Sequence, residues 1–235
     1  MYNRIGIIGD VHAEDHHLEL ALDFLVNAQV DVLLCTGDIV DGKGDVERCC
    51  ELLQNHHVAT VRGNHDRWVL QDKARHVPNA HKAENLSDDV LEFLNSLPTQ
   101  INIETTSGSL LLCHGVADND LQKIWPGTER MPIERSNRLD EIIATGEHSY
   151  MVNGHVHYRT MINFHELTLL NAGTLRGDHH PGFSILECET ERLTGYEFYP
   201  ELSQVREHHL KHPDHQYFDN TQDFEGNWQP VTLYA

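Results

Sequence analysis

The chain has no long hydrophobic run and few cationic side chains, and each shortage excludes a class of protein. No apolar stretch in its 235 residues approaches the roughly 18 residues of a membrane-spanning helix. No charged segment followed by an apolar one precedes the first predicted strand, so we expect no secretory signal and a cytoplasmic protein. There are 17 basic and 37 acidic residues, a formal charge of −20. That field repels phosphate backbones, so we do not expect a long nucleic acid as partner, and the lack of a long apolar run argues against a membrane.

Cysteine is scarce, and it occurs in no pattern that predicts chemistry. The sequence contains no Cys-x-x-Cys motif, and the number of cysteines is odd, which argues against a disulfide framework and favours a reducing compartment. None is followed by arginine six positions later, which excludes a cysteine-dependent phosphatase loop. Gly-x-Gly-x-x-Gly and Walker motifs are absent as well, so neither dinucleotide redox chemistry nor a nucleotide-driven motor is predicted. The cysteines are Cys35, Cys49, Cys50, Cys113 and Cys188.

Apolar spacing in the first quarter of the chain predicts alternating strands and helices. Strands are expected at 5–8, 32–35 and 58–61, because each is a short apolar run ended by glycine or a charged residue. Helices are expected at 15–27 and 45–55, where apolar residues recur at helical spacing. Strands connected through helices form a parallel sheet with both faces covered, and ligands bind at the carboxyl ends of such strands.

After residue 66, fewer of the predicted strands are connected through helices. Residues 67–86 show no strong period and are expected to be irregular. The remaining elements are a helix at about 88–97 that Ser87 caps, a hairpin of 101–104 and 110–113, a rim loop at 117–137, a helix at 134–144, a strand at 150–152, and an antiparallel second sheet from 160–162, 167–170, 183–186 and 194–198. We predict one domain over residues 1–200, with residues 201–235 packed on it as an irregular extension.

Five short polar stretches directly follow predicted strands. They are Gly9-Asp10-Val11-His12, Gly37-Asp38-Ile39-Val40-Asp41, Gly63-Asn64-His65-Asp66, Cys113-His114-Gly115 and Gly154-His155-Val156-His157. Together they supply seven oxygen or imidazole donors: Asp10, His12, Asp38, Asn64, His114, His155 and His157. Such a mixed set suits Mn, Fe, Zn, Ni or Co better than Mg or Ca. Seven donors exceed one tetrahedral site, so we expect two ions that share a carboxylate and hydrolyse a phosphoester.

One histidine of these stretches exceeds the metal count. His65 follows the expected ligand Asn64 and is the best candidate for the acid that protonates a leaving alkoxide. A carboxylate on its other ring nitrogen would fix the tautomer, and Asp41 is our first choice for that role. Asp66 is ranked second, because an aspartate at that place more often caps local backbone.

The order of the five stretches resembles the calcineurin-like metallophosphoesterase superfamily. Leu170-Asn171-Ala172-Gly173-Thr174 adds to the likeness to small bacterial members, which then covers roughly residues 5–198. The resemblance implies a four-layer α/β/β/α sandwich of two mixed sheets flanked by helices. It also implies one metal at Asp10, His12, Asp38 and His157, a second at Asp38, Asn64, His114 and His155, and His65 as the acid that Asp41 supports.

The departures from the family pattern bear on the substrate. Protein phosphatases of the superfamily carry a phosphate-binding arginine where Gly42 and Lys43 follow Asp41, and Asp66 and Ala13 also differ from their pattern. We therefore expect a small phosphomonoester or phosphodiester, such as a nucleotide or dinucleotide. The alternatives are a phosphoprotein phosphatase and a scaffold that keeps the fold without activity. Candidate substrate contacts are Lys43, Arg67, Arg176 and His179, although each also fits an ordinary surface position.

Overall fold

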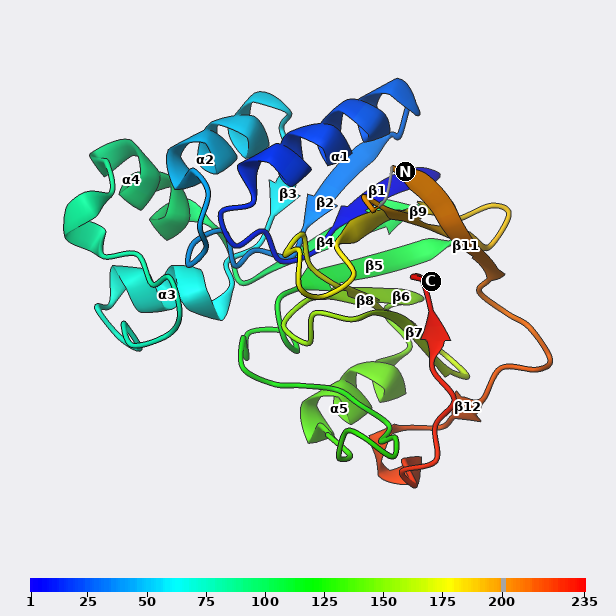
Figure 1. The fold of residues 1–235 in the computed structure, drawn as a ribbon. Coiled ribbons are helices and arrows are strands. Elements are labelled where there is room, and N and C mark those ends of the chain that lie inside the picture. Colours follow the sequence, from blue (N-terminus) through cyan, green and yellow to red (C-terminus); the bar gives the residue numbers. More distant parts are fainter. Residues whose placement is uncertain (200–201) are drawn as a thin grey trace.

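Two β-sheets stack face to face in the computed structural model, which describes residues 1–199 and 202–235 (Figure 1). The first sheet has the order β11 (Ser203–His209), β10 (Arg192–Glu197), β9 (Gly182–Glu187), β1 (Arg4–Ile8), β2 (Val32–Cys35), β3 (Ala59–Thr60). The second has the order β12 (Tyr217–Phe218), β7 (Arg159–Phe164), β8 (Thr168–Ala172), β6 (Tyr150–Asn153), β5 (Gly108–Cys113), β4 (Gln100–Thr105), with β13 (Val231–Thr232) beside β7.

Helices cover the outer face of each sheet. On the first sheet lie α1 (Asp15–Asn27), α2 (Val46–Asn55) and α4 (Asp88–Ser96), and α3 (Asn64–Leu70) lies beside α4. On the second lies α5 (Asn137–Thr145). Short 3₁₀ turns occur at Ala83–Asn85 and Thr221–Asp223. The chain therefore forms the four-layer sandwich of two mixed sheets that the resemblance implied.

Three apolar layers follow from the two-residue period of the strands. In β5, Leu110 and Leu112 pack between the sheets, whereas Leu111 and Cys113 face α5. Side chains on a strand alternate between its faces, and a sheet that is covered on both sides therefore needs apolar residues at nearly every position. The layer between the sheets fixes how they stack, and with it how the loops at their edges meet.

The predicted elements of the first quarter of the chain agree closely with the structure. The helix expected at 15–27 is α1, and the strand expected at 32–35 is β2. The strands β1, β2 and β3 run parallel, as strands joined through helices should. Ser87 caps α4 by accepting a hydrogen bond from the Val90 amide at 3.2 Å.

Other segment predictions were wrong. Residues 160–198 do not form one antiparallel sheet: β7 and β8 join the second sheet, whereas β9 and β10 extend the first one beyond β1. Apolar alternation looks the same in both sheets, so the pattern could not assign these strands. The stretch 67–86 is not wholly irregular, because α3 runs to Leu70 with the Asp66 side chain capping its first turn.

The C-terminal segment is also more regular than expected, and α5 begins later. β11 pairs with β10 of the first sheet, while β12 and β13 pair with β7 of the second. The predicted domain boundary, between residues 200 and 201, lies outside the described residues, and the division stays a prediction. The helix expected from residue 134 begins at Asn137, where Ser136 accepts from the Leu139 amide. Among the described residues, no helix has both the length and the apolar composition to cross a membrane.

Candidate metal centre

All five predicted polar loops meet at one edge of the sandwich. Three follow β1, β2 and β3 of the first sheet, and two follow β5 and β6 of the second, so every loop leaves the carboxyl end of a parallel strand. The stacking of the sheets brings the two groups of loops together. This edge is where parallel α/β sheets place their ligands.

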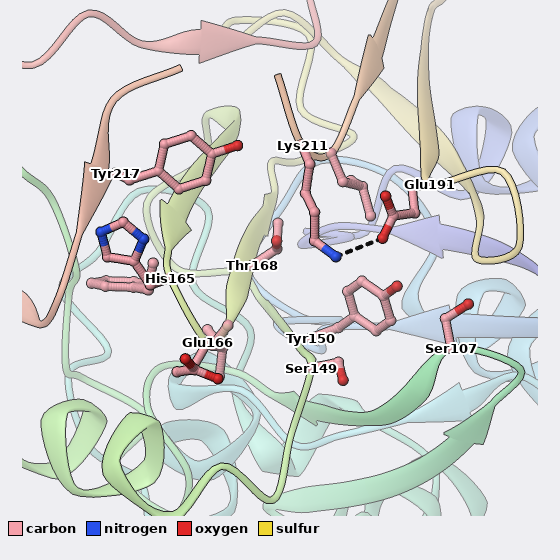
Figure 2. A pocket seen from close by; sticks show the side chains of 12 residues that line it. Ser107, Ser149, Tyr150, His165, Glu166, Thr168, Glu191, Lys211 and Tyr217 are labelled. Atoms are coloured by element: carbon pink, nitrogen blue, oxygen red, sulfur yellow. Dashed lines mark hydrogen bonds and ion pairs between the residues drawn. The ribbon is translucent and has the colours of Figure 1, made fainter. Parts of the chain in front are cut away.

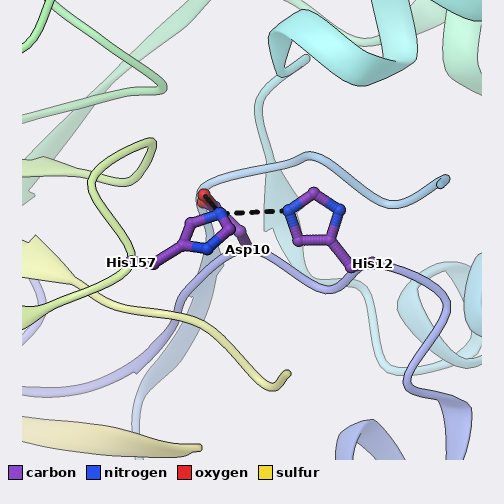
Figure 3. A group of neighbouring side chains, drawn as sticks. All are labelled: Asp10, His12 and His157. Atoms are coloured by element: carbon purple, nitrogen blue, oxygen red, sulfur yellow. Dashed lines mark hydrogen bonds and ion pairs between the residues drawn. The ribbon is translucent and has the colours of Figure 1, made fainter. Parts of the chain in front are cut away.

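The first cluster consists of Asp10, His12 and His157, whose ligand atoms lie within 4.8 Å of one another (Figure 3). The Nε2 atoms of the two histidines face each other at 3.1 Å. His157 Nε2 also lies 3.3 Å from Asp10 Oδ2. The structure thus brings together three of the four donors that were predicted for the first ion.

The second cluster consists of Asp38, His114 and His155, and Asn64 adjoins it. His114 Nε2 lies 3.0 Å from Asn64 Oδ1 and 3.4 Å from Asp38 Oδ2. The same Asp38 oxygen lies 3.9 Å from His12 Nε2 in the first cluster. A carboxylate between two clusters has the position that a bridging ligand requires.

The tautomers of two histidines show that the residues fit a cation. His12 Nδ1 lies 3.1 Å from the Val40 carbonyl, and His114 Nδ1 lies 2.7 Å from the Thr36 carbonyl. A carbonyl only accepts, so each Nδ1 carries the proton, and in the neutral ring Nε2 presents a lone pair. In His12 that lone pair faces imidazole and carboxylate groups, and in His114 the Nε2 position beside Asn64 and Asp38 suits a cation or a proton. Metal-bound histidines are held in this way, with the other ring nitrogen on a carbonyl.

Charge and burial in the two clusters favour cations as well. Burial lowers the pKa of His12 and of His155 to about 4, which keeps both rings neutral and able to ligate. Burial also acts to lower the pKa of His114, but the charges of Asp38 and Asp10 outweigh it and raise that pKa to about 10. The two buried carboxylates therefore stabilise positive charge between them.

The backbone around the clusters is held in an unusual conformation. His12, Asp38, His155 and His157 all have positive φ angles, between 47° and 68°. Each such residue costs about 1–3 kcal/mol and persists only where its surroundings enforce it. Gly63 lies directly against Asp38, and any Cβ at that glycine would overlap the carboxylate. The packing of the loops thus holds the backbone of these donor residues in a strained conformation, which fixes the directions of their side chains.

His65 lies between Asp41 and the clusters. Its Nδ1 donates to Asp41 Oδ2 at 2.7 Å, and its backbone amide donates to Asp38 Oδ1 at 2.7 Å. Burial acts to lower the pKa of His65, but the Asp41 hydrogen bond and the Asp38 charge raise it overall. A ligand atom of His65 also falls within 4.8 Å of those of His12 and Asp38, so the geometry permits His65 to bind a metal too.

The structure separates the two aspartates that sequence had ranked as partners of His65. Asp66 accepts from the amides of Gly63 at 2.9 Å and Ile39 at 2.7 Å, which ties two loops together. Burial and the Asp38 charge raise the pKa of Asp66 to about 6. Asp41 is the aspartate against His65, as preferred from the sequence, but the catalytic roles themselves stay predictions.

Two residues beside Asp41 were missed from the sequence. Arg75 donates to both Asp41 oxygens, at 2.9 and 3.1 Å, and the His81 amide donates to Oδ1 at 2.8 Å. Burial acts to raise the pKa of Asp41, but the bonds from His65 and Arg75 lower it overall. Both residues lie in the stretch expected to be irregular, where no motif or period marks them.

The four candidate substrate contacts lie around the centre but differ in their contacts. Lys43 and Arg176 line a cleft of about 270 Å³ together with His12 and Asp41. Arg67 is held by Asp120 of the rim loop through two hydrogen bonds of 2.6 and 2.8 Å.

The His179 ring, the fourth candidate, lies 5.2 Å from that of His157, between ring centroids. Its Nδ1 bonds to the neighbouring Asp178 at 2.9 Å. The roles of these four residues as substrate contacts stay predictions.

Comparison with known proteins supports the family resemblance. The sequence model of the calcineurin-like phosphoesterase superfamily domain matches residues 4–191. A curated relative, "uncharacterized protein MJ0912" of Methanocaldococcus jannaschii, is 27% identical over 128 residues, which make up 52% of this chain and 52% of that protein. The matched part of the chain thus spans about half the length of this relative.

Solved structures show the same fold. A metallophosphoesterase from Sphaerobacter thermophilus is 20% identical with a TM-score of 0.59, and the match covers 88% of this chain and 90% of the other. A structure described as a putative diadenosine tetraphosphatase is 20% identical with a TM-score of 0.56, over 87% of this chain and 94% of the other. At these identities the likeness establishes the fold alone.

Proposed function

We propose that this chain, which belongs to the calcineurin-like phosphoesterase superfamily, hydrolyses a small phosphomonoester or phosphodiester with two divalent metal ions. The observation that carries the proposal is the pair of adjoining clusters, with Asp38 between them and His65 beside them. The proposed ligands are those the sequence indicated: Asp10, His12, Asp38 and His157 for one ion, and Asp38, Asn64, His114 and His155 for the other. Two such ions lower the pKa of bound water and neutralise charge at phosphorus.

The chain's own side chains position the ions and supply the proton. Thr36 donates to one Asp10 oxygen at 2.8 Å, and the His155 amide donates to the other at 2.9 Å, which fixes the carboxylate plane. His65 has Nδ1 on Asp41, so its Nε2 is the atom left to protonate a departing alkoxide. Asp41 keeps this ring in one tautomer and stabilises its protonated form.

The substrate that we favour is a nucleotide or dinucleotide. The family neighbour described as a putative diadenosine tetraphosphatase supports this choice by analogy. A net charge of −20 disfavours long nucleic acids. Lys43 and Arg176, which line the cleft beside Asp41, would attract a second phosphate group, in competition with Asp178, which pairs with Arg176 at 2.9 Å.

The two alternatives receive less support. A phosphoprotein phosphatase of this superfamily would need the phosphate-binding arginine, whose place Gly42 and Lys43 occupy. A scaffold without activity would have no need for a complete donor set, yet all seven donors and the His65–Asp41 pair are present at one edge.

The proposal is tested by a hydrolysis panel with defined metals. Protein stripped with chelator and reloaded with Mn²⁺, Zn²⁺, Ni²⁺, Co²⁺ or Fe²⁺ is assayed on a nitrophenyl monoester, its bis-diester, dinucleoside polyphosphates and a phosphopeptide. We expect two bound ions by elemental analysis and turnover of the small esters. Turnover of the phosphopeptide alone would favour the protein phosphatase, and no turnover with two ions bound would favour the scaffold.

A further inference from the structure

A cleft lined by aromatic side chains lies next to the candidate metal centre. Its volume is about 550 Å³, within the range of roughly 300–1,000 Å³ that small-molecule sites occupy. Three segments form it: the rim loop, the start of β7 and the end of the chain. The side chains used in the argument are Trp125, Tyr158, Trp228, Gln229 and Tyr234.

A series of neighbouring rings leads from the metal centre to the cleft. Tyr158 directly follows the proposed ligand His157 in the chain. The His179 ring lies 5.2 Å from that of His157 and 6.3 Å from that of Tyr158. Tyr158 in turn lies 5.7 Å from Trp125 and 6.3 Å from Tyr234, between ring centroids. The Tyr158 side of the cleft thus lies one residue along the chain from the proposed ligand His157, with the His179 ring next to both side chains.

The C-terminal segment is fixed in place so that it forms one wall of the cleft. The Trp228 amide donates to the Gly127 carbonyl at 3.0 Å, and its ring meets that of Trp125 at 4.9 Å. Two residues before Tyr234, Thr232 pairs with β7, and the Leu233 amide donates to the Arg159 carbonyl at 2.9 Å. Such anchors give a preformed surface, which costs less ordering on binding than a mobile loop does.

Burial distinguishes the floor of the cleft from its walls. Trp125 and Trp228 are each 3% exposed and belong to the apolar layer outside the second sheet. Tyr158 and Tyr234 are half-buried. The indole N–H of Trp125 has no hydrogen-bond partner among the described residues. An apolar floor beside two partly exposed aromatic rings suits a flat ring system.

We propose that this cleft binds the nucleobase of a nucleoside phosphate whose phosphate group lies at the metal centre. The inference rests on the proposed function and names the substrate class for it. Heterocyclic bases offer a π face to the tyrosines, and Gln229 adds an amide that can pair with a base edge. Stacking on aromatic side chains contributes about 1–3 kcal/mol per base, and residues of the C-terminal segment supply part of it.

The first test measures binding without hydrolysis. Adenosine, with ribose as the matched sugar, is titrated into the metal-loaded Trp68→Phe protein, so that Trp125 and Trp228 give the fluorescence. We expect quenching by adenosine and none by ribose. Tyr234→Leu should weaken adenosine binding about tenfold, and Tyr234→Phe should restore most of it. Tyr217→Leu, which alters a tyrosine outside the cleft, should bind as the parent does.

The second test separates this inference from the proposed function. KM and kcat are measured for adenosine 5′-monophosphate and ribose 5-phosphate, and for the corresponding methyl diesters. We expect Tyr234→Leu to raise KM about tenfold for the adenosine compounds only. If the parent protein has equal KM values for the adenosine and ribose compounds and adenosine causes no quenching, the nucleobase site is wrong and the esterase activity still stands. Quenching without hydrolysis of any ester would keep the cleft as a nucleoside site and overturn the proposed function.

Discussion

The two ends of the stacked sheets carry polar side chains, but they are organised in different ways. At the carboxyl ends of β1, β2, β3, β5 and β6, seven donors meet in two buried clusters. At the opposite end of β6 lies a cavity of about 470 Å³ (Figure 2). There Lys211 pairs with Glu191 at 2.7 Å, and the rings of His165 and Tyr217 stack 5.6 Å apart. The labelled side chains surround this cavity without meeting at one point.

The two ends differ in the convergence and burial of their polar side chains. The side chains of Lys211 and Glu191 are 70% and 40% exposed, so water and salt screen their charges. Asp10 and His114 are at most 1% exposed; burial acts to lower the pKa of His114, but the charges of Asp38 and Asp10 outweigh it and raise that pKa to about 10. Groups that perturb one another in this way are typical of functional sites. We therefore expect substitutions in the buried clusters to have the largest effects and those at the opposite end of the sheets the smallest.

The largest effect is expected from Asp38→Asn at the point where the clusters join. An amide adds no charge and bridges two cations poorly, so the protein should lose at least one of its two ions. Since partners that merely support metal ligands are worth about 10–100-fold, loss of this ligand should lower kcat/KM by more than about 100-fold. Elemental analysis and steady-state kinetics check both expectations. Two ions retained at full affinity would exclude the bridging role.

His65→Gln should have the second largest effect, and it depends on the leaving group. Removal of a general acid costs about 10²–10⁴-fold when the leaving alkoxide is poor, whereas nitrophenolate leaves without a proton. We therefore expect a large loss of kcat on an alkyl phosphate, a small loss on the nitrophenyl ester and two bound ions. If the losses are equal, His65 is not the acid. If an ion is lost as well, the cluster of His12, Asp38 and His65 is the true ligand set.

Arg75→Met should have a moderate effect, because Arg75 acts through Asp41. The substitution removes both hydrogen bonds to a buried carboxylate, which should cost about 1–3 kcal/mol in the free energy of unfolding. Asp41 would then hold the His65 ring less firmly, so kcat on the alkyl phosphate should fall about tenfold while KM changes little. Arg75→Lys should recover part of both losses, which are measured by urea unfolding and kinetics. The control is Arg138→Met, whose exposed pair with Glu141 contributes little.

The sequence predicted which donor side chains meet at one edge of the sandwich, but it did not predict the residues that surround them. The positions of donors next to strand ends can be predicted from local sequence, because Asp10 and His12, like His155 and His157, are only two residues apart. Arg75 reaches Asp41 across 34 positions of sequence, and no periodicity marks such a contact. The same limit explains the strands after β8: alternation shows that β9 is a strand, whereas its pairing with β1 depends on how the chain crosses between sheets.

The cleft wall formed by the C-terminal segment shows this limit most clearly. Trp228 and Tyr234 were scattered aromatics in the sequence, in a segment expected to be irregular. Their places depend on the pairing of β13 with β7, which joins Thr232 to Thr160 across 71 intervening positions. Local propensity decides strands and helices, but only tertiary pairing brings these rings beside the metal centre.

The smallest effect is expected at the opposite end of the sheets, and it tests the comparison itself. Lys211→Met breaks an exposed ion pair. Such a pair contributes at most about 1 kcal/mol to the free energy of unfolding, and less at high salt. Kinetic constants for phosphoesters should stay within twofold of the parent values, with two ions bound, because the cavity faces away from every metal-binding loop. Thermal unfolding at low and high salt checks the stability, and the same hydrolysis panel checks the activity. A loss of activity as large as that from Asp38→Asn would show that the cavity beside Lys211 is coupled to the metal centre. The contrast between the two ends of the sheets would then be wrong.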